Sequence, residues 1–542
     1  MRTLAFAAAC LIGCNGSGSG SLELTLTLPT QPDLKPTGMT TVTVTATPPG
    51  ESPIATTSVL STMHKFAAGD LPVGPDVQIG VVLRDVSNRI VGVGEAGQTV
   101  DIVGDKATQI SIPVRRPFVY ASSAGSLYSF DPTLDPRDAK FQGKLAGVTN
   151  PLFTVSVGGD RLAVVSNNQV QVVVTATNTV LGSISVPAGV TDATAVPGTH
   201  KLAVAHASGI AIVDLDSGMA VNAAVGPVDR VTVGPGPDGL LYAYGLVGRV
   251  VPPENPPPLA MCSGTSSVVS VSVDTPGGET VRAPISLGAA ISDLAAAPDN
   301  AMLFATAPCT GKVVSIKGDV TTGGALTLTD VTPLERAAVL TVSADRIWAA
   351  GTRATTIACA TASGNGTTCQ PTTPLACPQP TTGSHVAFAV EGAGITVLSI
   401  PLGGGTPITL DVPGRRETIF DKNDGAKQHA QVLKALTTLP QDLVALPGGQ
   451  YVALVTQSRY YIEQLDNGVQ IILPCLDATT GDWLLLDAAS SSIAQRVRTA
   501  CSLTVGPADI FTDWECDAPP DGEGSDFGDY MPTSVGALFG AR

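Results

Sequence analysis

A short apolar strand sequence recurs along most of this chain of 542 residues. Each copy spans about four residues, nearly all of them Leu, Ile, Val, Ala or aromatic, which favours a buried strand. The copies begin at Phe118, Leu162, Leu202, Leu241, Leu303, Ile347, Val386 and Val452. Successive starts lie 44, 40, 39, 62, 44, 39 and 66 residues apart. Most of these steps are close to the roughly 40 to 50 residues of one β-propeller blade, so we expect an array of small sheets.

The sequence around each copy supports blades over a solenoid. Most copies follow another strand and a tight turn rich in Gly, Pro and Asp, as in residues 231–239, and a third strand follows, as in 170–175. Four antiparallel strands make one blade. Only 14% of the residues are charged, while Gly reaches 58 and Pro 42, which is typical of short strands joined by tight turns. We count eight candidate blades, with seven as the alternative because the unit at Val386 has the least convincing first strand.

The two ends of the repeat region complement each other. Residues 532–541 have the pattern of an inner strand with no blade after it, whereas the first unit, at Phe118, has no inner strand before it. Pairing these two segments would close the ring and leave no sheet edge exposed. Insertions are expected at 252–261, 421–439 and 474–529, the second with a helix over 426–436.

Two segments resemble a known propeller family. Residues 171–184 and 212–218, each a strand followed by a polar turn, look like the third-strand and fourth-strand segments of YVTN-type, lactonase-like propellers. The resemblance implies a propeller fold over residues 115–542. Some members of that family hydrolyse esters with His and acidic residues near the central channel, but no such cluster can be assigned here.

Residues 22–114 have a different sequence pattern, in which apolar and polar residues alternate. Leu22, Leu24, Leu26 and Leu28 alternate with polar residues, and 42–47 repeat this period of two. Seven or eight short strands in this segment predict an antiparallel β-sandwich. The segment resembles the immunoglobulin-like or transthyretin-like modules found next to lipid anchors.

The first fourteen residues read as an export signal. Arg2 is positive, residues 4–12 are apolar and too few to span a bilayer, and the run ends Leu-Ile-Gly-Cys. That ending resembles the lipobox of bacterial lipoproteins, which implies removal of residues 1–13 and diacylglycerol and acyl (palmitate) modification of Cys14. Residues 14–21 are then the lipidated cysteine and a Gly/Ser tether. Asn15, in the place where Asp commonly signals inner-membrane retention, favours the outer membrane. The alternatives are a cytosolic chain with an apolar start and an ordinary secretory signal.

Eight further cysteines favour disulfide bonds, because an exported protein meets an oxidising compartment. They are Cys262, Cys309, Cys359, Cys369, Cys377, Cys475, Cys501 and Cys516. Proximity in the sequence suggests that Cys262 pairs with Cys309. It also suggests one bond among Cys359, Cys369 and Cys377 and one among Cys475, Cys501 and Cys516. The cysteine left over from each of these two groups would then pair with the other. A metal site is less favoured, since no C-x-x-C spacing occurs.

The rest of the sequence offers little chemistry. Thirty Lys and Arg against 46 Asp and Glu argue against nucleic acid and against a basic membrane-binding face. No catalytic motif is present, and we interpret the five histidines as structural or surface residues: His64, His200, His206, His385 and His429. An acidic stretch, 509–529, suits either Ca²⁺ or a solvated loop, with the loop favoured. We expect no cofactor and no metal.

The hypothesis that these features favour is a lipid-anchored outer-membrane protein that binds an envelope protein or glycan through its propeller face. The alternative is a lactonase-like or other hydrolase with its site in the propeller channel. A purely structural role in the envelope is a third interpretation. The fold alone does not choose between them.

Overall fold

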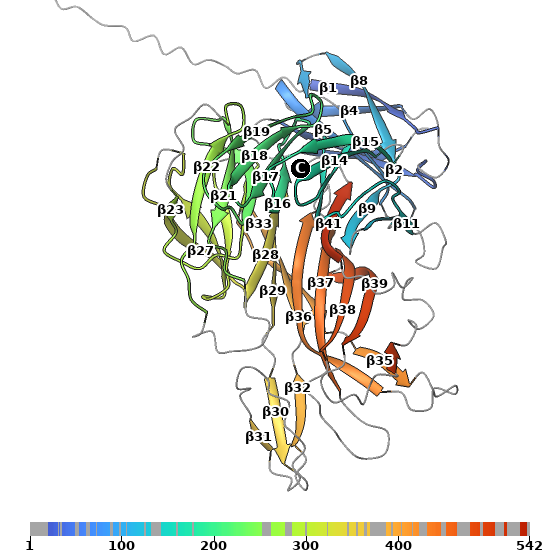
Figure 1. Cartoon of the computed structure of the whole chain (residues 1–542). Coiled ribbons are helices and arrows are strands. Elements are labelled where there is room, and N and C mark those ends of the chain that lie inside the picture. The colour runs from blue at the N-terminus through green and yellow to red at the C-terminus, as the bar shows by residue number, and fades with distance from the viewer. Residues whose placement is uncertain are drawn as a thin grey trace, which may run out of the picture.

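The chain is described here from a computed structural model, which covers residues 20–538 apart from gaps of five residues or fewer and the ranges 132–141, 252–261, 277–283, 369–385, 422–430, 463–476, 505–513 and 517–531. The described residues form strands and no α-helix (Figure 1). The all-β fold class is therefore as predicted. No helix in this part of the chain is long and apolar enough to cross a bilayer.

The N-terminal strands form one eight-stranded sheet. Its order is β3-β2-β5-β6-β8-β1-β4, with β7 paired to β5. Leu22, Leu24 and Leu26 of β1 are buried and alternate with partly or fully exposed residues. The period of two in the sequence therefore shows which face of β1 packs against the core. The strands are β1 (Gly20–Thr27), β2 (Thr41–Thr47), β3 (Ile54–Val59), β4 (Lys65–Leu71), β5 (Gly74–Arg84), β6 (Ile90–Glu95), β7 (Val100–Ile102) and β8 (Ala107–Arg115).

This unit departs from the predicted antiparallel sandwich in one pair. β1 runs parallel to β8, an arrangement that needs a long connection, which the rest of the unit supplies. Leu22 and Leu24 share one apolar cluster with Val42, Val44 and other residues of β2, β4 and β5. The division into two facing sheets stays a prediction, since hydrogen bonding runs continuously through the strand order.

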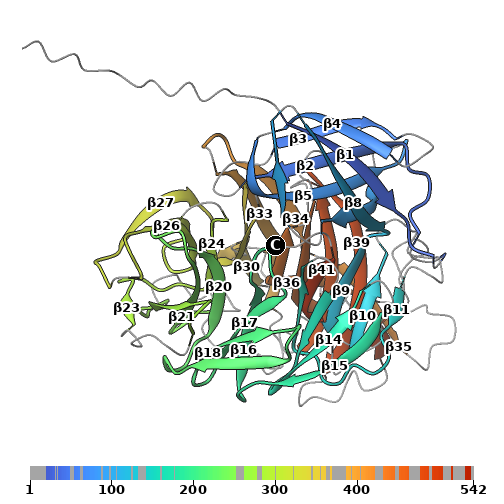
Figure 2. The same cartoon turned by 90° about the horizontal axis from the view of Figure 1, so that it is seen from above.

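Six four-stranded sheets follow, arranged as the blades of a propeller (Figure 2). Four of them hold four consecutive strands of the chain in antiparallel order, as the recurring sequence predicted. The sheets are β12 (Phe153–Val157) to β15 (Thr179–Ser185); β16 (Val190–Ala195) to β19 (Met219–Ala223); β20 (Arg230–Pro235) to β23 (Ile285–Ser286); β24 (Asp293–Ala296) to β27 (Thr327–Pro333); β28 (Ala337–Val342) and β29 (Arg346–Thr352) with β33 (Gly394–Pro401) and β34 (Ile408–Pro413); and β41 (Pro532–Leu538) with β9 (Phe118–Ser123), β10 (Ser126–Phe130) and β11 (Gln142–Lys144). The middle strands of the first four are β13 (Arg161–Val165), β14 (Gln169–Val174), β17 (Lys201–His206), β18 (Gly209–Asp214), β21 (Leu241–Val247), β22 (Ser267–Ser272), β25 (Leu303–Ala307) and β26 (Lys312–Lys317).

Packing between sheets holds this array together. One apolar cluster joins β12–β14 to β16–β18, with Val157, Val170 and Leu202 among its fully buried members. Further clusters join β17 and β18 to β20–β22, and β21 and β22 to β24–β26. Each sheet therefore buries its two faces against its neighbours, which explains why the repeated strands are apolar on both faces.

The predicted closure is confirmed. β41 pairs antiparallel with β9, so the last strand of the chain joins the first strand of the repeat region. A six-stranded sheet, in the order β39-β38-β37-β36-β35-β40, lies next in the array, because β36 contacts β28 on one side and β41 on the other. Its strands are β35 (Arg416–Asp421), β36 (Gln431–Ala445), β37 (Tyr451–Ile462), β38 (Asp477–Asp487), β39 (Ser492–Thr504) and β40 (Trp514–Cys516).

The predicted seven or eight blades are not confirmed, because six sheets have the four-stranded form in the described residues. The strand at Val386, β32 (Val386–Glu391), forms no blade. It pairs with β30 (Thr356–Thr361), which also pairs with β31 (Gly366–Thr368), and this small sheet interrupts the chain between β29 and β33. A strand pattern in the sequence identifies a strand but not the strand with which it pairs. A strand of an insertion therefore could not be distinguished from a strand of a blade.

The helix predicted over 426–436 is wrong where it is described. Residues 431–436 belong to β36, which pairs with β35 and β37 over much of its length, and residues 426–430 lie outside the described residues. Cross-strand pairing overrides the local helical preference of this segment.

The two ends of the ring differ. Except in the closing sheet of β41 and β9–β11, the first strand of each four-stranded sheet is joined to the second by a short connection, such as residues 236–240, where Gly239 has a φ of 78°. The β21–β22 connection and the segment that carries β30–β32 follow second strands and so begin at the other end of the ring, which we call the insertion face. Figure 1 shows β30–β32 at this end and the N-terminal sheet at the opposite end.

Candidate functional site: the central cavity

The first strands of the sheets surround a central cavity of about 550 Å³. Six first strands form most of its wall, namely β12, β16, β20, β24, β28 and β36, and Gln457 of β37 also lines it. Figure 2 looks along this ring of strands. The volume lies in the range of small-molecule sites, which is roughly 300 to 1,000 Å³.

Charged side chains gather at the insertion-face end of the cavity. Asp192, Arg230 and Asp293 lie at or near the starts of β16, β20 and β24, and Arg249 follows the end of β21. Asp442 of β36 also lines the cavity. The opposite end is lined by small and apolar residues, namely Ala195, Pro197, Val233, Ala296, Pro298 and Val342. One mouth is therefore charged and the other is not.

Arg230 is the centre of a buried ion-pair group. Its Nη1 lies 3.4 Å from Oδ1 of Asp192, and its Nε lies 3.7 Å from Oδ1 of Asp293. All three side chains are less than a fifth exposed. Burial opposes the charge on Arg230, but the surrounding carboxylates outweigh it and raise the pKa of the guanidinium, which stays protonated. Burial raises the pKa of Asp192, and Arg230 and the Val231 N–H oppose that rise.

Side-chain oxygens connect four successive inner strands, β16, β20, β24 and β28. Asp192 accepts a hydrogen bond from the backbone N–H of Val231 at 2.8 Å, and Asp293 accepts one from Leu340 at 2.9 Å. Between them, the hydroxyl of Thr232 accepts the N–H of Ala296 at 3.0 Å. An inner strand is the edge of its sheet, so its outward N–H groups need such partners. We call these three contacts the inner-strand latches.

Arg249 has a different environment. Its Nε donates to the carbonyl oxygen of Ser292 at 2.8 Å, and its backbone N–H donates to Asp229 at 2.9 Å. No carboxylate of the described residues lies within 4 Å of its guanidinium. Burial, followed by the charge of Arg230, lowers the pKa of Arg249. Its terminal nitrogens are therefore hydrogen-bond donors at the mouth with no bond inside the described protein.

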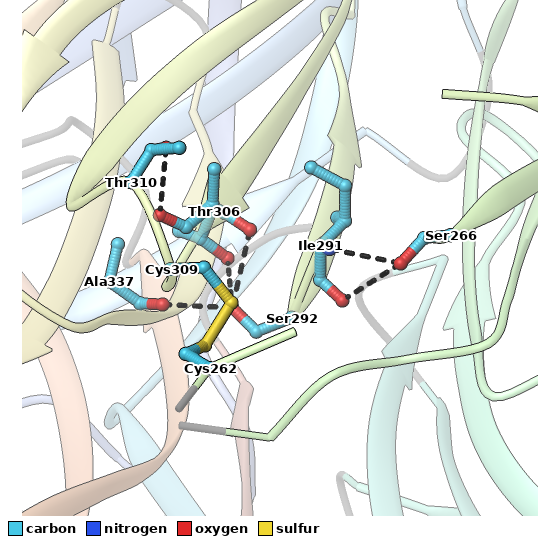
Figure 3. Close-up of a disulfide and its surroundings, with 9 residues drawn as sticks. Cys262, Ser266, Ile291, Ser292, Thr306, Cys309, Thr310 and Ala337 are labelled. Carbon is cyan, nitrogen blue, oxygen red and sulfur yellow. Dashed lines mark hydrogen bonds between the residues drawn. A yellow bond between two sulfur atoms is a disulfide. The ribbon is translucent and has the colours of Figure 1, made fainter. Parts of the chain in front are cut away.

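A disulfide lies near the end of the β21–β22 connection. Cys262 and Cys309, the pair suggested by sequence proximity, are bonded, and the bond connects the β21–β22 connection to the turn after β25 (Figure 3). Beside it, the hydroxyl of Ser292 lies 2.8 Å from that of Thr306 and donates to the carbonyl of Ala337. The hydroxyl of Ser266 accepts the N–H of Ile291 at 2.9 Å. These bonds fix one side of the charged mouth.

For the other cysteines predicted to form disulfides, the structure describes at most the position of the backbone. Cys359 lies in β30, Cys501 in β39 and Cys516 in β40, and their side chains are not among those described. Cys14, Cys369, Cys377 and Cys475 lie outside the described residues, so their lipidation and pairing stay predictions.

The two described histidines have the structural surroundings that we expected of them. His206 is buried, and its ring bonds to Asn222 at 2.8 Å, while Ser208 N–H donates to Nδ1. His200 contacts Asp216 at 2.9 Å, on a surface that also includes Arg161. Neither lines the cavity. His64, His385 and His429 lie outside the described residues.

The described residues contain no group of three or more His, Cys, Asp or Glu that could hold a metal ion. Of the acidic stretch 509–529, Glu515 lies in β40, while Asp509, Asp513, Asp517, Asp521, Glu523, Asp526 and Asp529 are outside the described residues. Calcium binding there stays untested.

The sequence analysis missed the cavity aspartates, although a signal for them exists. Asp192, Asp293 and Asp442 each stand ten residues before the first residue of a recurring strand, at Leu202, Leu303 and Val452. A polar residue at one fixed place in an otherwise apolar repeat points to a shared position in the ring, here the charged mouth.

Comparisons with known proteins do not assign the chain to a family. No family model and no curated protein matches the chain. Among solved structures, a chain of Kuenenia stuttgartiensis hydrazine synthase is 13% identical with a TM-score of 0.34, and covers 65% of this chain and 96% of its own length. The β-propeller domain of Myceliophteria thermophila Cps50 (Swd1) is 11% identical with a TM-score of 0.34, covering 63% and 95%; U3-55K is 10% identical with a TM-score of 0.31, covering 50% and 84%. The propeller arrangement of this chain therefore rests on its own sheet topology.

Proposed function

We propose that this protein is a lipid-anchored binding or scaffold protein of the bacterial envelope that takes its ligand at the insertion face of the propeller. The observation that carries the proposal is the central cavity, whose one charged mouth opens at the end of the ring where the long connections gather. Concave sites with a few convergent polar groups are the usual binding sites of such folds.

The position of the N-terminal unit supports this orientation. β1 begins at Gly20 in the sheet that lies at the opposite end from β30–β32 (Figure 1). An anchor at Cys14, joined by the tether 14–21, would leave the insertion face directed away from the membrane. The proposed organisation is a signal over 1–13, an Ig-like or transthyretin-like sandwich over 22–114, and a YVTN-type propeller over 115–542 in which the six-stranded sheet serves as a seventh blade.

Two experiments test this proposal. Mass spectrometry of the protein from membranes is expected to find an N-terminal acylated Cys14, and Cys14→Ala is expected to release the protein from the outer-membrane fraction, because two or three acyl chains anchor where one is marginal. An intact Met1 with a free thiol would contradict the anchor. Pull-down of tagged protein from intact envelopes is expected to recover the same protein or glycan repeatedly, and failure to do so would contradict the binding role.

A hydrolase with its site in the channel is the second candidate, and the observation that favours it is the presence of Asp442 beside Asp192 and Asp293 at one mouth. Against it, Asp192 and Asp293 already accept backbone N–H groups and pair with Arg230. The described lining includes no His, Cys, Lys or Glu. Hydrolysis of simple lactones or esters that disappears in Asp442→Asn would support this candidate, and the absence of turnover in the unmodified chain would exclude those substrates.

A further inference from the structure

We propose that the outer edge of β19 is a binding surface for an extended segment of a partner protein, which adds to the sheet β16–β19 as a fifth strand. β19 (Met219–Ala223) is the last strand in the order β16-β17-β18-β19, so it lies at the opposite edge of the sheet from the cavity wall. None of its residues lines the cavity. The proposed surface is therefore separate from the charged mouth.

The outer edge of β19 is open. In the part of the chain that the structure describes, no strand pairs with β19 on the side away from β18. Residues 219–222 are all exposed, with Met219 at 62% and Val221 at 39%. A free edge presents backbone N–H and C=O groups at the spacing of a strand, and an added strand pairs with these groups.

Most other outer strands of the ring have features that oppose such pairing. β11 and β23 have only three and two residues. β27 contains Asp330 and Pro333. β34 contains Asp411 and Pro413, and β39, the outer strand of the six-stranded sheet, contains two arginines. Short edge strands, charges and prolines are common means of preventing edge-to-edge pairing.

Only β15 and β19 among these outer strands lack all of these features, since neither contains a charged residue or a proline. The pairing of β15 with β14 is interrupted by a register shift between Val172 and Val173, whereas β19 pairs with β18 without one. β15 lies beside β19, and its Leu181 is 61% exposed. β19 is therefore the outer strand best suited to accept another strand, and β15 extends the apolar surface next to it.

The size and charge of this surface favour a segment of another protein over a second copy of the chain. Two copies joined through β19 would contribute five residues each, whereas a stable interface uses roughly 20 to 30 residues a side. The formal net charge of −16 repels a second copy and attracts a basic partner. We therefore expect a segment that is uncharged where it pairs with β19 and flanked by Lys or Arg.

Hydrogen exchange of the full chain in the presence of a synthetic peptide tests the inference. The probe is the peptide Lys-Thr-Val-Thr-Val-Thr-Lys, and in the comparison peptide the three central residues are proline, which cannot donate to a ladder. We expect the probe, at about ten times its Kd, to slow exchange about tenfold at the alternate amides of β19 that point away from β18. The proline peptide is expected to have no effect.

Two variants locate the effect on β19. Val221→Lys places a charge on the exposed edge and is expected to abolish the slowing, because a charged side chain on an edge strand opposes pairing. Thr329→Lys is the matched control, since it adds the same charge to β27, another exposed outer strand, and is expected to leave the slowing at β19 unchanged.

Several outcomes would overturn the inference. Absence of slowing by the probe at about 1 mM would mean that the edge does not accept a strand. Equal slowing by the proline peptide would mean that no ladder forms, and this comparison holds even if Val221→Lys fails to fold. Equal slowing in a folded Val221→Lys variant would remove β19 from the contact. Sedimentation of the unmodified chain as a dimer that Val221→Lys separates would make a second copy the occupant. The cavity takes no part in this experiment, so a negative result leaves the ligand site proposed at the insertion face unaffected.

Discussion

Removing the carboxylate of Asp293 is expected to loosen the contact between β24 and β28 at the charged mouth. Asp293→Ala deletes the acceptor of the Leu340 N–H, which lies 2.9 Å from Oδ2, and one of the two carboxylates beside Arg230. The side chain of Asp293 is 13% exposed, so water replaces it poorly. The neutral latch of Thr232 to Ala296 offers a matched comparison in the same ring.

The magnitude follows from the bonds that are lost. A buried N–H left without its acceptor costs about 1 to 3 kcal/mol, and a bond to a charged acceptor lies toward the upper end of that range. Arg230 keeps Asp192, so the larger penalty of an isolated buried charge is avoided. We therefore expect a loss of about 3 kcal/mol for Asp293→Ala and about 1 kcal/mol for Thr232→Val.

Hydrogen exchange of the Leu340 and Ala296 amides measures these losses locally, which matters because a chain with several units does not unfold in one step. A loss of about 3 kcal/mol corresponds to exchange about 150-fold faster at Leu340, and about 1 kcal/mol to about fivefold at Ala296. Asp293→Asn, whose amide oxygen still accepts, is expected to fall between the two. Acceleration below about tenfold at Leu340 in Asp293→Ala would refute the latch.

Three other predictions concern the ring and its connections. Replacing Cys262 and Cys309 together by Ser is expected to destabilise the sheets they join by up to about 4 kcal/mol, because the bond closes 47 residues of chain, and an unchanged melting temperature would contradict this. Burial lowers the pKa of His206, so the folded state takes up its proton less readily than the unfolded state, and stability from this residue is present above about pH 6.5 and lost as the pH falls below it. Melting curves of His206→Gln are expected to show a smaller loss between about pH 7.5 and pH 5, and an identical loss would refute the assignment. Gly209→Ala is expected to cost about 1 to 3 kcal/mol, since its Cβ would meet the backbone of β19, whereas Gly182→Ala has open space and should be nearly neutral; equal melting temperatures for the two variants would contradict this.

The sequence by itself determined the strands and the way the ring begins and ends. Seven of the eight recurring apolar segments lie in propeller sheets or in the six-stranded sheet beside them, and the C-terminal segment pairs with β9 as expected. These features are local: a buried strand requires apolar side chains, and a tight turn requires Gly, Asp or Pro, whatever the rest of the fold does.

Only the tertiary structure decided which strands share a sheet and what the polar residues do. The segment at Val386 and residues 431–436 have local patterns that fit a blade strand and a helix, yet distant partners place them in an insertion sheet and in β36. Asp192, Asp293 and Arg230 are more than thirty residues apart from one another in sequence, and the ring brings them to one mouth. Contacts of this kind depend on the closure of the whole array, which no single segment of the sequence encodes.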